Sequence, residues 1–187
     1  MKGRKERICP MKIILHACCA PCSVKSVESL RDEGIRPVLF WHNPNIHPFT
    51  EYKNRQDGLI LYSQSEKVEA VWDEGAYGLR TFLSALGADI AMGARCEKCY
   101  RMRLEATARY ASENAFDGFS TTLLISPYQK HERIRELGEM ISEECGIPFV
   151  YRDFRPLFRA GQRAAAEMGL YRQKYCGCIF SEEERYI

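Results

Sequence analysis

The stretch KIILHACCAPCSVKSVESLRDEGIRPVLFW, residues 12–41, decides the fold of this chain. Both ends of the stretch are short runs of apolar residues, which are typical of buried strands. Between the two runs lie apolar residues at helical spacing, followed by a glycine of the kind that ends helices: Val24, Val27, Leu30 and Gly34. A strand, a helix and a second strand in this order predict a parallel pair joined by a right-handed crossover.

The same alternation continues toward the carboxyl end of the chain. Three further apolar or β-branched runs predict strands, at 68–72, 117–125 and 148–154. Helical spacing recurs at 104–111 and at 134–145. We therefore expect one domain over residues 1–187 of the α/β class, with a Rossmann-like, mostly parallel sheet and helices on both faces.

Composition limits the classes of protein to which the chain can belong. Of its 187 residues 45% are hydrophobic, which is enough for one buried core, and the net charge of +2 is too small to imply nucleic-acid binding by itself. No stretch reaches the roughly 18 apolar residues of a membrane span. The start, MKGRKERICPMK, is basic but lacks the long apolar region of a signal peptide. We expect a cytoplasmic protein without a membrane partner.

Nine cysteines in such a chain favour metal ligands or redox thiols over structural disulfides. Cys18, Cys19 and Cys22 follow the first predicted strand, where open parallel sheets bind their ligands. Cys96 and Cys99 stand one turn apart at the start of a predicted helix, where the helix dipole favours thiolates. We expect these five thiols to converge on one edge of the sheet.

Two kinds of metal site are compatible with this spacing. Cys19 and Cys22, together with Cys96 and Cys99, would supply the four ligands of a tetrahedral zinc ion, but Cys18 would then have no role. An iron–sulfur cluster contains several iron atoms, so it accommodates adjacent cysteines at a strand-to-helix corner better than a single ion does. The spacing therefore favours a cluster over zinc.

Cys176 and Cys178 are separated only by Gly177, a residue that makes a tight backbone turn possible. Two cysteines so close can form a small, strained disulfide ring that is easily reduced, which predicts a redox pair. Two further metal ligands are the alternative interpretation. For the remaining cysteines we expect a core position at Cys145, on the apolar side of its helix, and no role for Cys9.

Five motifs, spread over nearly the whole chain, resemble one known family: HACCAPCS, PNIHPFTEYKNR, RCEKCYRMRLEATA, TTLLISPYQ and YRQKYCGC. Together they are similar to QueH, the non-cobalamin epoxyqueuosine reductases. The resemblance implies reduction of the epoxide of epoxyqueuosine, a modified guanine nucleoside at the wobble position of certain tRNA anticodons, to the alkene of queuosine. This is the last step of queuosine biosynthesis. It also implies a fold related to the adenine-nucleotide α-hydrolase (HUP) group.

The resemblance implies roles for particular cysteines. The positions expected to hold a [4Fe-4S] cluster are matched by Cys18, Cys19, Cys96 and Cys99, and the redox-active catalytic pair by Cys176 and Cys178. Cys22 and Asp153 are left over, and together they could hold an additional iron ion. Asp153 could equally pair with Arg152 or Arg155. The expected partners are a tRNA that carries epoxyqueuosine and an electron donor.

One departure from the wider fold group bears on the alternatives. Its pyrophosphatases have a Gly- and Ser-rich loop after the first strand that binds pyrophosphate, whereas this chain has HACCAPCS there. We therefore expect no ATP hydrolysis or adenylation. An enzyme like the tRNA sulfurtransferases, which would need that loop for activation, is the first alternative. A zinc-stabilised RNA-binding module without catalysis is the second.

Candidate residues for proton transfer and RNA binding are numerous, and the sequence favours none of them individually. The candidate proton donors are His16, His42, His47 and His131. The candidate phosphate-binding residues form two groups, Arg95, Lys98, Arg101 and Arg103, then Arg152, Arg155, Arg159, Arg163, Arg172 and Lys174. The aromatic residues that could stack on an unpaired base are Tyr100, Tyr128, Tyr151, Phe154 and Tyr171.

Overall fold

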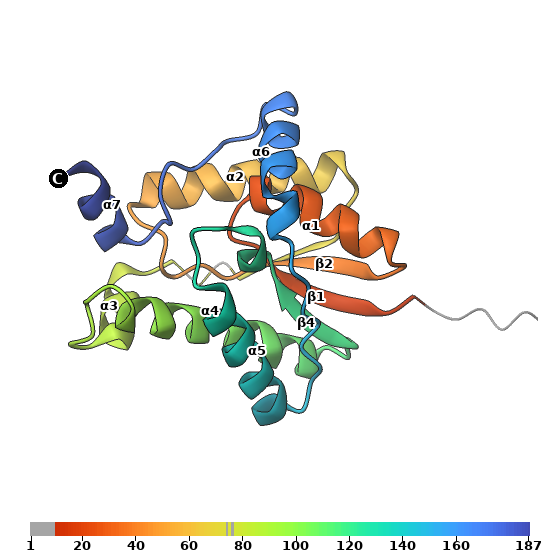
Figure 1. The fold of residues 1–187 in the computed structure, drawn as a ribbon, viewed down its shortest axis with the longest axis horizontal. Coiled ribbons are helices and arrows are strands. Elements are labelled where there is room, and N and C mark those ends of the chain that lie inside the picture. The colour runs from red at the N-terminus through yellow and green to blue at the C-terminus, as the bar shows by residue number, and fades with distance from the viewer. Residues whose placement is uncertain (1–9, 74, 76) are drawn as a thin grey trace, which may run out of the picture.

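The computed structural model describes residues 10–73, 75 and 77–187 and shows a sheet between two layers of helices (Figure 1). Within this part of the chain, four strands lie in the order β3-β2-β1-β4, and all neighbours are parallel. Their bounds are β1 Lys12–His16, β2 Arg36–Trp41, β3 Ala70–Trp72 and β4 Gly118–Thr121. The predicted α/β class with a parallel sheet is confirmed.

Helices cover both faces of the sheet. Their bounds are α1 Ala20–Asp32, α2 Phe49–Ser65, α3 Leu79–Leu86, α4 Ala94–Glu113, α5 His131–Cys145, α6 Phe158–Glu167 and α7 Ile179–Tyr186. In Figure 1, α1, α2 and α6 lie on one side of the sheet and α3, α4 and α5 on the other. No helix in the described residues combines the length and the apolar composition needed to cross a membrane.

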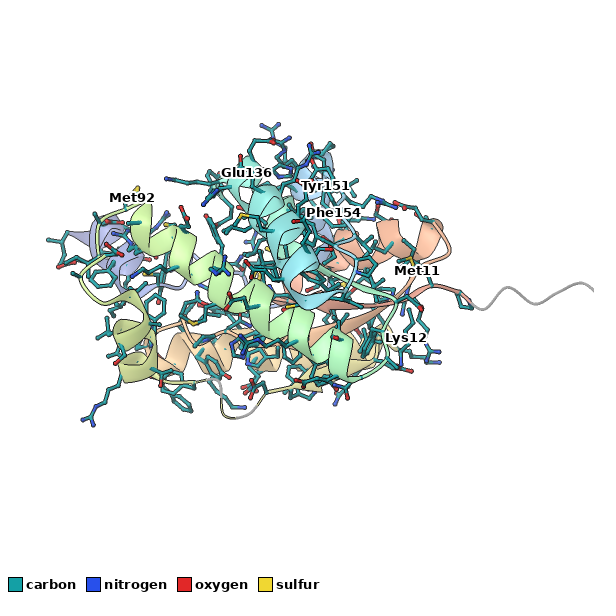
Figure 2. All side chains as sticks on the ribbon, turned by 90° about the horizontal axis from the view of Figure 1, so that it is seen from below. Met11, Lys12, Met92, Glu136, Tyr151 and Phe154 are labelled. Carbon is teal, nitrogen blue, oxygen red and sulfur yellow. The ribbon has the colours of Figure 1, made fainter. Side chains whose placement is uncertain are left out.

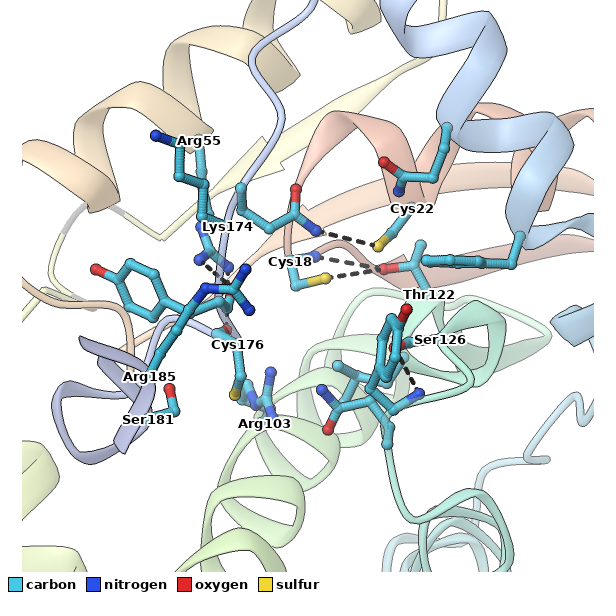
Figure 3. Close-up of a pocket in the computed structure, with 17 residues that line it drawn as sticks. Cys18, Cys22, Arg55, Arg103, Thr122, Ser126, Lys174, Cys176, Ser181 and Arg185 are labelled. Atoms are coloured by element: carbon cyan, nitrogen blue, oxygen red, sulfur yellow. Dashed lines mark hydrogen bonds between the residues drawn. The ribbon is translucent and has the colours of Figure 1, made fainter. Parts of the chain in front are cut away.

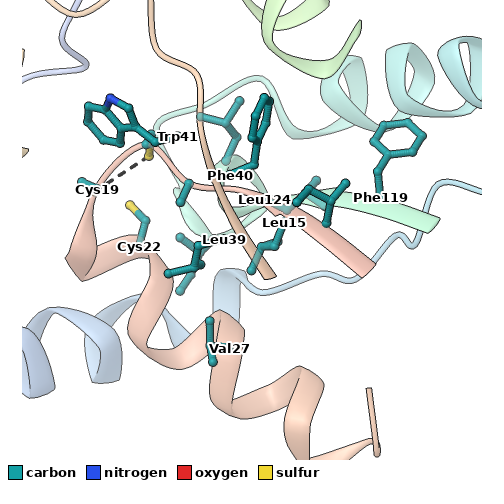
Figure 4. Packing of buried hydrophobic residues seen from close by; sticks show 14 of the residues in the cluster. Leu15, Cys19, Cys22, Val27, Leu39, Phe40, Trp41, Phe119 and Leu124 are labelled. Carbon is teal, nitrogen blue, oxygen red and sulfur yellow. Dashed lines mark hydrogen bonds between the residues drawn. The ribbon is translucent and has the colours of Figure 1, made fainter. Parts of the chain in front are cut away.

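The core lies on both faces of β1 and β2. Ile13, Ile14 and Leu15 are fully buried in succession, as expected for a strand of a parallel sheet that helices cover on either side. Leu39 of β2 and Val27 of α1 belong to the same core (Figure 4). On the opposite face, α4 and α5 cross the sheet, and Figure 2 shows the side chains on this side.

Three predicted strands differ from the observed ones, and the first of them, predicted at 68–72, begins only at Ala70. The strand predicted at 117–125 ends at Thr121, because the Thr121 hydroxyl accepts a hydrogen bond from the Leu123 N–H and the chain turns into a 3-10 helix, Thr122–Ile125. The strand predicted at 148–154 is wrong: only Phe149 bridges Phe119. Pro148 has no N–H to donate to a ladder, and the Tyr151 N–H donates to the Phe149 carbonyl instead of to β4.

Candidate functional site

Three thiols gather at the corner where β1 ends and α1 begins. Cys19 is the last residue before α1, and Pro21 lies in the first turn of that helix. Because the backbone changes there from extended to helical, the side chains of Cys18, Cys19 and Cys22 meet, and their Sγ atoms all lie within 4.8 Å of one another. The Sγ atoms of Cys18 and Cys19 are 3.8 Å apart. Figure 4 shows Cys19 and Cys22 beside the core at the start of α1.

The three buried sulfurs differ in acidity. Hydrogen bonds from Cys19 and Cys22 hold the pKa of Cys18 well below its usual value. Burial raises the pKa of Cys19, and the hydrogen bond with Cys18 is the main reason why the pKa of Cys22 is raised. Three adjacent cysteine sulfurs are a soft donor set that fits iron, zinc or part of an iron–sulfur cluster. The residues present are therefore compatible with the cofactor that the sequence predicts.

A cavity of about 640 Å³ opens beside this corner, and Cys18, Cys22 and Cys176 all line it (Figure 3). Its lining contains four cationic side chains: Arg55, Arg103, Lys174 and Arg185. No acidic residue lines it among those that the structure describes. Arg55 pairs with Glu51 behind the wall, whereas Arg103, Lys174 and Arg185 have no carboxylate partner among the described residues, so the cavity favours an anionic occupant.

A second group of thiols lies behind the cavity wall. Cys99 of α4 and Cys178, the residue before α7, are buried in a small apolar cluster with Phe82 and Leu86 of α3. Burial raises the pKa of Cys99 to about 12 and also raises that of Cys178. Cys96, one turn before Cys99, is half-buried against the main core. Neither Cys96 nor Cys99 lines the cavity, and among the described residues the only three cysteines whose sulfurs all lie within 4.8 Å of one another are Cys18, Cys19 and Cys22. The structure therefore brings together three of the five thiols that the sequence expected to converge, and the place of Cys96 and Cys99 in one site with them stays a prediction.

Arg103 connects the two groups of thiols. It is 2% exposed, its Nε donates to the Cys99 carbonyl at 3.1 Å, and its side chain reaches the cavity. Burial opposes the charge of Arg103, yet the neighbouring sulfurs of Cys99, Cys176 and Cys18 outweigh burial and raise its pKa. No carboxylate pairs with it in the described part of the chain. The guanidinium also lies over the Tyr100 ring, 5.8 Å from its centroid. A buried cation without a carboxylate partner stabilises negative charge placed beside it, such as an anionic group held by the thiols.

The loop that carries Cys176 and Cys178 is clamped to α2 by Arg55. This guanidinium donates to the carbonyls of Tyr175 and Cys176, at 2.9 and 3.0 Å, and forms an ion pair with Glu51 at 2.7 Å. Arg55 is only 2% exposed. The hydroxyl of Tyr175 donates to the His47 carbonyl, and that of Tyr171 to Glu51. The position of the cysteine pair therefore depends on α2.

Gly177 fits a space that no side chain could share. Its φ is +109°, and an added Cβ would lie 3.0 Å from Arg55 and 3.1 Å from Ile46. We expect Gly177→Ala to lower the free energy of unfolding more than Gly146→Ala, where φ is +63° but the space is open. The backbone cost at Gly146 is about 1–2 kcal/mol, and the contacts at Gly177 add about 1–3 kcal/mol. Urea unfolding of the two variants measures the difference, and equal losses would contradict this account.

His16 is held as a neutral imidazole. Its Nε2 faces two acceptors, the His42 carbonyl and Asn43 Oδ1, at 3.3 and 3.2 Å. Nδ1 lies 3.0 Å from the Thr121 hydroxyl, which donates to it and accepts from Leu123. The neutral tautomer with its proton on Nε2 therefore satisfies both ring nitrogens, because Nε2 donates and Nδ1 accepts. Burial, followed by the charge of Arg103, lowers the pKa of His16 to about 3, so the imidazolium needed for general acid catalysis does not form near neutral pH.

This imidazole makes the stability of the metal-free protein depend on pH. The pKa of His16 is 6.5 in the unfolded chain and about 3 in the folded one, so below pH 6.5 the unfolded state binds the extra proton. We expect the contribution of His16 to be constant above pH 6.5 and to fall by up to about 1.4 kcal/mol per unit below it. Urea unfolding at several pH values measures the loss. A His16 NMR titration midpoint near 6.5 in the folded protein would contradict it.

The other histidines have different surroundings. His42 Nδ1 lies 2.8 Å from Asp73, and His131 Nε2 lies 3.0 Å from the Tyr151 hydroxyl. His47 is buried against Phe82, and its ring nitrogens have no hydrogen-bond partner in the residues described. Burial lowers its pKa. None of these three rings lines the cavity.

Asp153 is engaged away from the cysteines. Its carboxylate binds the Arg155 guanidinium through both oxygens, at 2.8 and 2.7 Å, and also accepts from the Arg155 backbone N–H. These bonds lower the pKa of Asp153 to about 2. Asp153 does not line the cavity that Cys22 lines. The structure thus shows the pairing with Arg155 that the sequence left open, and it does not bring Asp153 to Cys22. Cys9 lies outside the described residues.

Most of the candidate RNA-binding residues are already occupied. Arg95, Lys98, Arg101 and Arg152 form ion pairs with carboxylates. Among the aromatic candidates, Phe154 and Tyr100 are buried in the core, Tyr171 donates to Glu51, and Tyr151 packs against His131. Of the basic and aromatic candidates together, only Arg103, Lys174 and Tyr128 line the cavity.

Several cavity residues were not found from the sequence. The most important is Arg55, whose signal was the Glu51-x3-Arg55 spacing within the motif PNIHPFTEYKNR, since residues four apart face each other on a helix. Gln173, whose amide donates to the Cys22 sulfur at 3.7 Å, and Thr122, which lies 3.7 Å from the Cys18 sulfur, had no local signal. Arg185 had none either.

Comparisons with known proteins agree with this arrangement. A family model described as "Epoxyqueuosine reductase QueH" matches residues 13–184. Similar curated proteins of the same name come from Dehalococcoides mccartyi, 35% identical over 94% of each chain, and from Thermotoga maritima, 34% identical over 92% of this chain and 91% of the other. Among solved structures, a predicted tRNA methyltransferase subunit from Methanocaldococcus jannaschii has the same fold. Its TM-score is 0.55 at 15% identity, over 84% of this chain and 75% of that one.

Proposed function

Because this chain belongs to the epoxyqueuosine reductase QueH family and is an oxidoreductase of queuosine biosynthesis, we propose that the cysteine-lined cavity is where epoxyqueuosine in tRNA is reduced to queuosine. The observation that carries the proposal is the meeting of Cys18, Cys22 and Cys176 in one cationic cavity without an acidic residue among its described lining. Thiols supply reducing equivalents, and the cations suit a nucleotide phosphate.

Five thiols would hold the cofactor, and two of them, Cys18 and Cys22, line the cavity. We assign Cys18, Cys19, Cys96 and Cys99 to a [4Fe-4S] cluster, and Cys22 to an additional iron. When bound, the cluster supplies single electrons, and an iron with an open position draws electron density from an epoxide oxygen. The meeting of the Cys18, Cys19 and Cys22 sulfurs and the buried charge of Arg103 between Cys99 and the cavity support this assignment, because a cation at that place stabilises an anionic sulfur group.

The Cys176 and Cys178 thiols can balance the reaction. Converting an epoxide to an alkene breaks two C–O bonds, consumes two electrons and two protons, and releases water. Oxidation of two thiols to one disulfide supplies both electrons and both protons. Cys176 lines the cavity, and Cys178, two residues further along the chain, is buried, so Cys176 would meet the substrate side and Cys178 would complete the disulfide. A thiol or another low-potential donor must then reduce the pair again.

The tRNA would enter with its wobble nucleoside first. An anticodon-loop base is already single-stranded, so turning it into a cavity costs little compared with a paired base. The volume of about 640 Å³ lies within the usual range for small-molecule sites, which accommodates one nucleotide. Arg55 holds the redox loop at the floor, while Lys174 and Arg185 supply charge in the wall (Figure 3).

The test is anaerobic reaction of the iron- and sulfide-reconstituted protein with tRNA that contains epoxyqueuosine, in the presence of a chemical reductant. The tRNA is then digested to nucleosides and analysed by mass spectrometry. The proposal expects the modified nucleoside to lose one oxygen. An unchanged nucleoside, from protein with its full iron and sulfide content, would overturn it. A product that gains sulfur would indicate a sulfurtransferase, and protein that retains zinc but no iron would indicate a structural zinc site.

A further inference from the structure

One aromatic side chain at the cavity is exposed without an evident structural reason. Tyr128 lines the cavity, yet 84% of it is exposed, more than any other aromatic residue in the part of the chain that the structure describes. Exposing an aromatic ring forgoes a large hydrophobic gain, so such a ring in the wall of a binding cavity indicates a surface that a ligand covers.

The ring is held in place although it is exposed. Tyr128 lies in the loop between the Thr122–Ile125 turn and α5, and its backbone N–H donates to the Ser126 hydroxyl at 3.3 Å. The following two residues are bound to the buried Tyr100: Gln129 accepts from its hydroxyl at 2.7 Å, and the Lys130 N–H donates to it at 3.3 Å. The loop is therefore anchored on the core directly after the exposed ring.

A second aromatic residue supports the first. Phe158, at the start of α6, forms an edge-to-face contact with Tyr128, with 5.8 Å between ring centroids and 83° between ring planes. Phe158 also lines the cavity. The contact fixes the tilt of the Tyr128 ring from one direction and leaves most of the ring uncovered. A preset, uncovered ring is the arrangement in which base stacking loses the least conformational entropy.

The positive charge of the cavity around Tyr128 indicates which class of ligand would bind there. Arg55, Arg103, Lys174 and Arg185 line the same cavity, and the wall that the structure describes contains no acidic residue. A flat aromatic group with a phosphate attached satisfies both the ring and the cations, as a nucleotide of single-stranded RNA does. Arg55 is already paired with Glu51, but an apolar peptide would leave Arg103, Lys174 and Arg185 without an anionic partner.

We propose that Tyr128, supported by Phe158, is the platform on which the base of the modified wobble nucleoside stacks while its epoxide-bearing group reaches the cysteines. This inference rests on the proposed function and adds the residue that holds the base. It also explains why the other aromatic candidates are not needed: Tyr100 serves as the anchor of the loop, and Phe154 is 1% exposed.

The experiment measures binding of a fluorescein-labelled anticodon stem-loop RNA that carries epoxyqueuosine to the anaerobically reconstituted protein. Three variants are compared with the unaltered chain by fluorescence anisotropy: Tyr128→Ala, Tyr128→Phe and Tyr186→Ala. Tyr186 is also exposed but does not line the cavity, so its replacement is the matched control. We expect Kd to rise about 5- to 100-fold in Tyr128→Ala and to stay within about twofold in the other two.

Each other outcome has a distinct meaning. An unchanged Kd in Tyr128→Ala would overturn the stacking role, and equal losses in the alanine and phenylalanine variants would show that the hydroxyl acts instead of the ring. An equal loss in Tyr186→Ala would show a general surface effect and would also overturn the inference. The unaltered protein is assayed in parallel for oxygen loss from the nucleoside. If the proposed function is wrong, the unaltered protein itself shows no oxygen loss, and this result is independent of the binding data for the variants.

Discussion

Cys99→Ala is expected to abolish epoxide reduction and to lower the iron and sulfide that the protein retains after anaerobic reconstitution. Loss of a residue that only supports a metal ligand costs about 10- to 100-fold in metal affinity or activity, so loss of a ligand itself is expected to cost more. The change removes one sulfur from a small apolar cluster with Phe82 and Leu86, so most of the fold should survive. Iron and sulfide are measured chemically, and oxygen loss from the nucleoside by mass spectrometry.

Cys145→Ala provides the matched control. Cys145 is half-buried at the end of α5, packs against the main core and does not line the cavity. Its replacement removes the same sulfur atom and should leave iron content and activity unchanged. If Cys99→Ala retains the iron and the activity of Cys145→Ala, Cys99 is not a cluster ligand, and the assignment of the site would have to move to the other thiols.

Arg55→Leu is expected to lower the free energy of unfolding by about 3–5 kcal/mol. The change leaves the Glu51 carboxylate buried without its cation, and it removes the donors of the Tyr175 and Cys176 carbonyls. Total stability of domains is typically about 5–15 kcal/mol, so a loss of this size is a large fraction of it. Urea unfolding followed by circular dichroism measures the change.

Arg101→Leu is the control for this ion pair. Arg101 also pairs with a glutamate four residues away on its helix, Glu105, but both side chains are partly exposed, so we expect a loss of at most about 1 kcal/mol. A second measurement separates the effect of Arg55 on the loop of Cys176 and Cys178 from its effect on stability. Alkylation of Cys178 in the native protein should become faster in Arg55→Leu and should stay unchanged in Arg101→Leu. Equal stability losses in the two variants, with Cys178 still protected, would show that Arg55 does not clamp the loop.

The layers of the fold could be predicted because their signals are local. A strand of a covered parallel sheet is buried on both faces, so β1 and β2 leave unbroken apolar runs, and α1 leaves apolar residues at helical spacing. The segment 148–154 has the same apolar character but pairs only at Phe149. Its backbone does not form a longer ladder because Pro148 lacks an N–H and the Tyr151 N–H donates to the Phe149 carbonyl. The apolar residue types of the segment do not reveal these two features.

The candidate site was predictable where its residues are close in the chain. Cys18, Cys19 and Cys22 stand within one turn of each other, so the strand-to-helix corner alone brings their sulfurs together. The spacing of Cys96 and Cys99 likewise places both on the first turns of one helix. Asp153 is the opposite case, because the choice between Cys22 and Arg155 depended on where the chain runs after β4.

The sequence by itself determined the parallel α/β architecture, the position of the thiols at the ends of its elements and the family to which the chain belongs. Only the tertiary structure decided that Arg55 binds the loop of Cys176 and Cys178, that the buried Arg103 reaches the cavity and that Tyr128 stays exposed there. The physical reason is distance along the chain. Arg55 and the carbonyls that it binds are 120 and 121 residues apart, and contacts of that range leave no periodicity that local patterns can reveal.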